Sequence, residues 1–211
     1  MRLASIATCI VTGLLVGGAT RLVKADCVAP DHSTLPSGCM LLDTTRTTTG
    51  QAGMFRNKEL ERVGPSPATP PPGGSLVSFF DVFATLELSQ DAGETWHNVH
   101  VSGTGQQRVY RPTGADTYET ELLELTLTGG ELPPGMSLRE RADQVSQGNS
   151  TISPLGGGYS VSSFFDVFTE LSLDGGTSWQ PADAPWHLTL QGPTPTATRP
   201  TTWGSLKLLY R

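Results

Sequence analysis

The sequence is poor in cysteine, in positive charge and in helical periodicity, and each shortage excludes a class of protein. Three cysteines among 211 residues are too few for a disulfide-rich scaffold. Fourteen basic residues against 20 acidic ones give a net charge of −6, which argues against nucleic acid or an anionic membrane surface as the partner. Only residues 54–63 carry a short helix-compatible pattern, so a protein built from long helices is not expected.

Glycine and proline, by contrast, are abundant. The 24 glycines and 16 prolines favour turns and short strands over helices. Five prolines between residues 65 and 72, followed by Gly73 and Gly74, predict a stiff and extended connector. The expected fold class is therefore all-β.

Residues 1–25 have the pattern of a signal peptide. A positive start at Met1-Arg2 precedes an uncharged, mostly apolar run over residues 3–20, and cleavage is expected after Ala25. An uncleaved membrane anchor is the alternative, although this run is short for a span. The pattern predicts export to the extracellular space, the periplasm or the cell surface, with no membrane span in the mature chain.

Cleavage after Ala25 would remove Cys9 and leave two cysteines in the mature chain. Cys27 and Cys39 are 12 residues apart, and in an exported chain they most simply form one disulfide. A zinc site would lack ligands, because no histidine pair lies nearby. No cofactor is expected.

One hexapeptide occurs twice in the chain. Residues 78–83 read Ser-Phe-Phe-Asp-Val-Phe, and residues 163–168 repeat them letter for letter. Each copy runs into an acidic, glycine-bearing turn closed by a tryptophan, at residues 89–96 and 172–179. This predicts an internal duplication that forms two related β-sandwich-like repeat units.

The predicted domain organisation follows from the duplication. The signal peptide, residues 1–25, precedes an N-terminal segment with the disulfide loop and the proline-rich connector, residues 26–72. The two repeat units then span residues 73–118 and 119–192. A Pro/Thr linker and C-terminal tail, residues 193–211, ends the chain, and its last ten residues either dock on the body or act as a sorting or attachment signal.

The strand that begins with the first hexapeptide alternates regularly. One face carries Phe80, Val82, Ala84, Leu86 and Leu88, which predicts a core face. The opposite face begins with phenylalanines and ends with acidic residues. We expect its aromatic start to be covered by another sheet or loop and its acidic end to meet water.

The two turns resemble the Asp-box, or BNR motif, whose pattern is Ser-x-Asp-x-Gly-x-Thr-Trp. Residues 89–96 fit every fixed position, and residues 172–179 differ only in having Ser178 where the pattern has threonine. The resemblance implies a structural hairpin corner, in which an aspartate accepts backbone hydrogen bonds, a glycine permits the turn and a tryptophan covers it. The corner residues are Asp91, Gly93, Trp96, Asp174, Gly176 and Trp179.

The motif also occurs in sialidases, but the rest of the sequence does not favour that reading. Two repeats of about 85 residues are too long for propeller blades and too few to close a ring. The longer unit, from the glycines before the hexapeptide to the tryptophan, resembles a repeat of uncharacterised exported bacterial proteins. That resemblance implies no activity.

Several carboxylates are weighed as sites. Asp81 and Asp166 lie between phenylalanines, where each needs a hydrogen-bond partner, and a Ca²⁺ ion held with turn carbonyls is the alternative. Glu119, Glu121 and Glu124 have the chemistry of acid–base residues, but a solvated strand face explains them better. No set of residues has the pattern of a catalytic site.

The expected function is non-enzymatic. We expect an exported structural or interaction protein of the cell envelope or extracellular space, with a cell-surface protein or a glycan as the partner. A carbohydrate-binding module is the first alternative, with Trp186 and Trp203 as exposed binding aromatics. A secreted glycoside hydrolase is the second.

Overall fold

The computed structural model describes residues 27–30, 32–36, 38–49, 53–64 and 68–192. These residues form strands and no helix, which confirms the all-β class. The predicted signal peptide and C-terminal tail lie outside them, and no helix long and apolar enough to cross a membrane occurs within them. The strands are β1 (Cys27–Ala29), β2 (Met40–Asp43), β3 (Thr47–Thr49), β4 (Gly53–Val63), β5 (Ser75–Ser89), β6 (His97–Tyr110), β7 (Thr117–Gly130), β8 (Ser137–Glu140), β9 (Ser146–Leu155), β10 (Gly158–Val167), β11 (Thr169–Ser172), β12 (Gln180–Pro181) and β13 (Trp186–Gln191).

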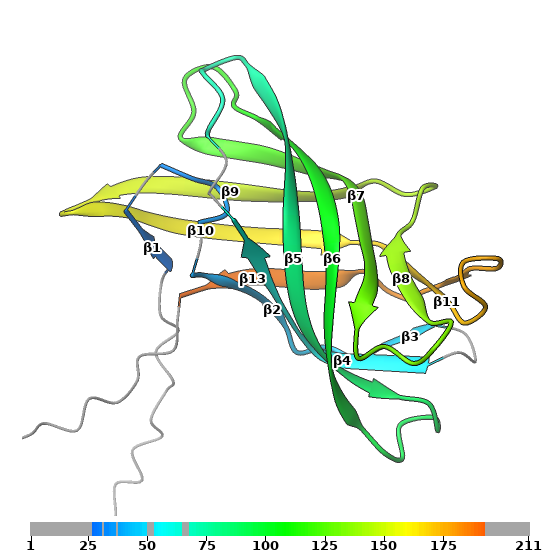
Figure 1. Ribbon diagram of the computed structural model, residues 1–211. Coiled ribbons are helices and arrows are strands. Elements are labelled where there is room, and N and C mark those ends of the chain that lie inside the picture. The colour runs from blue at the N-terminus through cyan, green and yellow to red at the C-terminus, as the bar shows by residue number, and fades with distance from the viewer. Residues whose placement is uncertain (1–26, 31, 37, 50–52, 65–67, 193–211) are drawn as a thin grey trace, which may run out of the picture.

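Eight of these strands close into one antiparallel barrel (Figure 1). The order around it is β10-β13-β2-β4-β5-β6-β7-β9, and β9 closes the ring because it pairs with both β7 and β10. Strands β1, β3, β8, β11 and β12 extend the sheet outside this ring. The chain therefore forms a single barrel where two sandwich-like units were expected.

The two hexapeptides explain why the sandwich expectation was wrong. The first lies on β5 between β4 and β6, and the second begins on β10 between β9 and β13. Each hexapeptide thus lies on the middle strand of three adjacent strands, and β7 and β2 fill the two gaps between these sets. Neither set of three strands closes alone, so the two hexapeptide strands share one interior.

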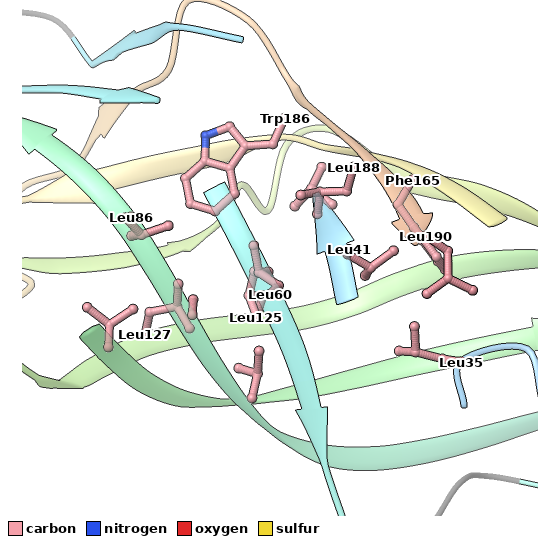
Figure 2. Close-up of a cluster of buried hydrophobic side chains, with 14 of the residues drawn as sticks. Leu35, Leu41, Leu60, Leu86, Leu125, Leu127, Phe165, Trp186, Leu188 and Leu190 are labelled. Atoms are coloured by element: carbon pink, nitrogen blue, oxygen red, sulfur yellow. The ribbon is translucent and has the colours of Figure 1, made fainter. Parts of the chain in front are cut away.

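The inner face of β5 is the predicted core face. Val82, Ala84, Leu86 and Leu88 are all buried, as the alternation predicted. Figure 2 shows Leu86 in the central cluster with Leu60, Leu127, Phe165 and Trp186.

The expectation for the other face of β5 was wrong. Phe79 is 74% exposed and Phe83 is 58% exposed, so no layer within the described residues covers the aromatic start of that face. The reason is topological: a barrel has one interior, and the side chains that alternate away from it face outward.

Residues 54–63, which carry the helix-compatible pattern, form strand β4 instead. The register of β4 against β5 shifts between Arg56 and Glu59, and Asn57 has a positive φ of 47°. This β-bulge adds a residue and reverses the alternation, so that Lys58 and Arg62 point inward with Leu60. The inward charges made the segment look helical in the sequence.

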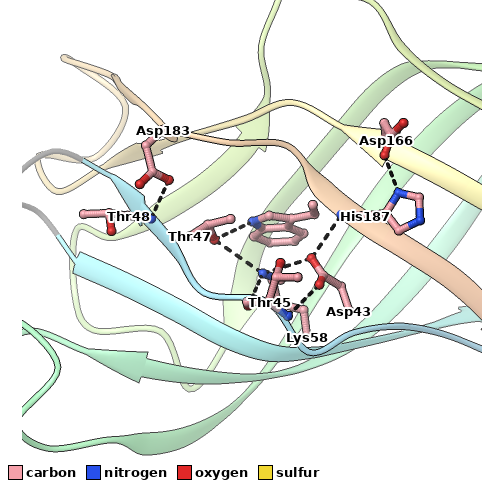
Figure 3. Close-up of polar contacts among 9 residues, drawn as sticks. Asp43, Thr45, Thr47, Thr48, Lys58, Asp166, Asp183 and His187 are labelled. Atoms are coloured by element: carbon pink, nitrogen blue, oxygen red, sulfur yellow. Dashed lines mark hydrogen bonds and ion pairs between the residues drawn. The ribbon is translucent and has the colours of Figure 1, made fainter.

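A buried polar network joins β2, β3, β4 and β13 (Figure 3). The Lys58 ammonium lies 3.0 Å from the Asp43 carboxylate, and both side chains are almost fully buried. Lys58 also donates to the Thr45 carbonyl at 2.8 Å, while the backbone N–H of His187 donates to Asp43 at 3.0 Å. Burial lowers the pKa of Lys58, and the hydrogen bond and charge of Asp43 act in the opposite direction.

The predicted disulfide joins Cys27 to Cys39. Both cysteines are buried, and residues 33–35 of the loop between them are buried too. Ser163, from the second hexapeptide, donates its hydroxyl to the Thr34 carbonyl at 3.1 Å. The disulfide loop is thus packed against the barrel at β10.

Candidate functional site

Each hexapeptide presents a Phe-x-Asp pair on the outer face of the barrel. Phe79 and Asp81 project from β5, and Phe164 and Asp166 occupy the equivalent positions of β10. Since alternate residues of a strand share a face, the pair points outward while the intervening residue points to the core. The outward phenylalanines are 74% and 43% exposed.

Both pairs line open grooves of similar size. The Phe79 groove has a volume of about 620 Å³ and lies over β5 and β6, with Asp81, Thr104, Gln106 and Glu124 among its lining residues. The Phe164 groove has a volume of about 560 Å³ and extends across β6, β7, β9 and β10. Both volumes fall in the range of small-ligand sites.

The Phe164 groove contains more paired charges. Arg108 contacts Glu121 at 2.8 Å, and the His187 Nδ1 atom lies 2.6 Å from the Asp166 carboxylate (Figure 3). The His187 ring also stacks on Phe164, with the ring centroids 5.9 Å apart. These contacts give partners to Arg108, Glu121 and Asp166, three of the polar side chains that line the groove.

The two tryptophan turns have the same hydrogen bonds. In the first turn, the Gly93 N–H donates to Ser89 Oγ at 2.8 Å. The Asp91 carboxylate accepts from Ser89 Oγ at 2.7 Å, from the Thr95 N–H at 2.9 Å and from the Thr95 hydroxyl. In the second turn Ser172, Asp174, Gly176 and Ser178 make the equivalent bonds at 2.5–2.8 Å. Both glycines have positive φ, 89° at Gly93 and 91° at Gly176, so only glycine fits there without strain.

An arginine covers the tryptophan of each turn. The Arg56 guanidinium lies 4.1 Å from the centre of the Trp96 ring and pairs with Glu87 at 2.5 Å. Arg139 lies 3.9 Å from Trp179 and pairs with Glu170 at 2.6 Å. The arginine and glutamate are directly opposite each other in both strand registers. The similarity of the two turns therefore extends to the arginines of β4 and β8, two strands whose sequences are not alike.

The turn aspartates make stability depend on pH. The Thr95 and Ser89 hydrogen bonds hold the pKa of Asp91 well below its usual range, and those of Ser178 and Ser172 lower the pKa of Asp174 to about 2. A carboxylate whose pKa falls on folding stabilises the fold above its unfolded pKa, here 3.8, and this contribution is lost as the pH drops through the folded value.

We expect Asp91→Asn combined with Asp174→Asn to lower the free energy of unfolding at pH 6 and to flatten its decline between pH 4 and pH 2. Urea unfolding across this range measures both effects. Asp116→Asn is the control, because that carboxylate is 87% exposed and belongs to neither turn. If the unfolding free energy of the double variant declined with falling pH as steeply as that of the wild type, the turn aspartates would not be the cause of the decline.

The structure divides the carboxylates weighed as sites between the two grooves. Glu119, Glu121 and Asp166 line the Phe164 groove, whereas Asp81 and Glu124 line the Phe79 groove. Asp81 and Asp166 lie on β5 and β10, which are not neighbours in the barrel. Asp166 finds its partner in His187. In the described part of the chain, no three or more His, Cys, Asp or Glu side chains are grouped as metal ligands.

Trp186 was expected to be an exposed binding residue, and this was wrong. It is completely buried in the core, where it packs against Phe55 and donates to Thr47 Oγ1 at 3.2 Å. It begins β13, whose alternation places it inside and His187 outside. Trp203 lies outside the described residues.

Sequence reasoning missed the residues that do line the grooves. Tyr110 and Phe164 were not among the predicted site residues, yet they are 38% and 43% exposed in one groove. The alternation of β10 placed Phe164 opposite the core. The sequence did not predict that the sheet closes into a barrel, and it is this closure that places β6 and β10 on either side of one groove.

Comparisons of the chain with protein-family models, with curated proteins and with solved structures give no match.

Proposed function

We propose that the chain is an exported, non-enzymatic interaction protein of the cell envelope or the extracellular space. The observation that carries the proposal is an apolar stripe on the outer face of β5. It consists of Val77, Phe79 and Phe83, which are 46%, 74% and 58% exposed. Large apolar side chains that lie together in water mark interaction surfaces.

The charges around the apolar stripe favour a protein partner with a basic rim. Asp81 lies between the two phenylalanines, and Glu61 of β4 is directly opposite Phe83. Arg108, which is directly opposite Val77, is paired with Glu121. Glu124 lines the adjoining Phe79 groove. A second copy of the chain would bring like charges together, with a net charge of −6 on each copy. A surface with an apolar centre and surrounding lysines or arginines would complement the stripe.

Site-specific photo-crosslinking in the native cells tests this proposal. A photoreactive phenylalanine analogue at Phe79 is expected to give one dominant protein adduct, which mass spectrometry identifies. The same analogue at Leu173, which is 45% exposed on the second tryptophan turn, is the control and should not give it. The purified partner should then bind at least tenfold more weakly to Phe79→Ser.

The stability of the variant separates binding from folding. Because Phe79 is mostly exposed, Phe79→Ser should change the free energy of unfolding by no more than about 0.5 kcal/mol. Equal cross-linking at Phe79 and Leu173 would contradict the proposal. Turnover on a panel of glycosidase and esterase substrates would contradict its non-enzymatic part.

Export is tested by the intact mass of the protein in fractionated native cells. We expect a mass that begins at Asp26, found in the envelope or the medium. A mass that begins at Met1 in the cytoplasmic fraction would contradict it. A mass that lacks the last residues of the chain would support a sorting or attachment role for the tail.

The proposal includes an origin by internal duplication, with two related repeat units inside the one barrel and an Asp-box hairpin in each. The identical hexapeptides and the matching turn hydrogen bonds support it. The Asp-box turns then act as structural corners and not as the binding site. This agrees with their tryptophans being covered by Arg56 and Arg139.

A further inference from the structure

Two rows of side chains cross the Phe164 groove from β6 through β7 and β9 to β10. The first row has an aromatic ring at each end and consists of Tyr110, Glu119, Asn149 and Phe164. The second row is polar throughout and consists of Arg108, Glu121, Gln147 and Asp166, with His187 of β13 beyond it. All but His187 line the groove.

The spacing of the two rings fits an elongated ligand. Tyr110 and Phe164 are three strand spacings apart along the row, which is roughly 14 Å at 4.7–4.9 Å per spacing. They are 38% and 43% exposed, so each offers a ring face to a ligand. A ligand that contacts both rings must extend across the polar centre between them.

The polar side chains of the second row can form hydrogen bonds with a ligand. The Arg108–Glu121 pair and the Asp166–His187 pair fix four of them at 2.8 Å and 2.6 Å. Carboxylates, amides and a guanidinium are planar groups that bind two neighbouring donors or acceptors at once. Pairs of adjacent hydroxyl groups are the matching partner.

This arrangement is the reverse of a protein interface. Protein interfaces have an apolar centre and a polar rim. Here the centre is polar and the apolar rings lie at the two ends. The hydrogen bonds of the strand backbones below are made within the closed barrel, so an added β-strand has no edge to pair with at this place.

The charge of the groove selects among ligands. Glu119, Glu121 and Asp166 face Arg108 and His187, so acidic groups outnumber the permanent positive charge. An anionic ligand would meet this excess at close range and would be repelled. A neutral or positively charged ligand would not.

We propose that the Phe164 groove binds an oligosaccharide of neutral or amino-sugar units. Sugar rings have apolar faces, which stack on Tyr110 and Phe164, and hydroxyl edges, which reach the polar centre. The groove borders the apolar stripe of β5, because Arg108 is directly opposite Val77, but it contains none of the three stripe residues and the inference does not rest on the stripe. Failure of cross-linking at Phe79 therefore leaves this inference standing.

Isothermal titration calorimetry of the full chain with three probes tests the inference. Cellohexaose is neutral, a chitosan hexamer is cationic and an oligogalacturonate is anionic. We expect binding of the neutral or the cationic probe and none of the anionic one. Tyr110→Ala and Phe164→Ala should each weaken binding at least tenfold, and Phe164→Tyr should keep it.

Leu173→Ala is the control, because it removes an exposed apolar side chain that lies outside the groove and outside the apolar stripe, and it should leave the affinity unchanged. The melting temperature of every variant is measured beside its affinity, so that unfolding is recognised. The inference is overturned if no probe binds, if the oligogalacturonate binds best, or if Tyr110→Ala and Phe164→Ala bind as tightly as the wild type. Hexalysine that binds in the same groove would mean a peptide site instead, and would overturn it as well.

Discussion

Replacing Trp186 by alanine is expected to lower the free energy of unfolding by about 3–5 kcal/mol. The indole is completely buried and packs against Phe55, with ring centroids 6.3 Å apart. Its removal leaves a large cavity in the centre of the barrel. The change also removes the indole N–H that donates to Thr47 Oγ1, and the aromatic ring whose centre lies 5.5 Å from the Lys58 ammonium.

Urea unfolding followed by circular dichroism measures this loss. Phe83→Ala, which removes an exposed ring, should change the free energy by no more than about 0.5 kcal/mol. Trp186→Phe should lose less than Trp186→Ala, because it keeps most of the volume. A loss below about 1 kcal/mol for Trp186→Ala would mean that the barrel interior is not packed around this residue.

The second large effect is expected for Asp43→Ala, at about 3–5 kcal/mol. This change leaves the Lys58 charge buried without its counter-ion. It also removes the acceptor of two backbone N–H groups, those of Thr45 and His187, at 2.7 and 3.0 Å. Urea unfolding at pH 7 is the measurement.

Replacing both Asp43 and Lys58 by apolar residues shows whether the loss in Asp43→Ala comes from the unpaired Lys58 charge or from lost packing. Asp43→Leu combined with Lys58→Met removes both charges and should be less destabilising than Asp43→Ala alone. The exposed pair is the control: Glu121→Ala removes the partner of Arg108 and should cost about 0–1 kcal/mol. A double variant that is worse than Asp43→Ala would show that the ion pair itself stabilises the fold.

The sequence predicted those features that depend on neighbouring residues. Period-2 alternation placed Val82 to Leu88 in the core, and the separation of Cys27 and Cys39 predicted their disulfide. Both are local, because they need only the geometry of one strand or one short loop.

Features that depend on closure of the sheet were not predictable in this way. Trp186 alternates with His187, but its sequence does not show which of the two faces the interior. The bulge at Asn57 reversed the alternation of β4 and concealed the inward Lys58. The Phe164 groove needs β6 and β10 on either side of β7 and β9, and their pairing joins residues far apart in the chain. Long-range pairing leaves no pattern in a single stretch of sequence.

The two hexapeptides lie in different halves of one barrel, and these halves pair along two lines, β2 with β13 and β7 with β9. Around the ring, β2 pairs with both β4 and β13 on one side, and β7 pairs with both β6 and β9 on the other. The connection from β7 to β8 is the short segment 131–136. If that segment straightens, β2 and β7 of one molecule can pair with β13 and β9 of another and rebuild the same contacts. A domain-swapped dimer formed in this way would contain one hexapeptide from each chain in every barrel.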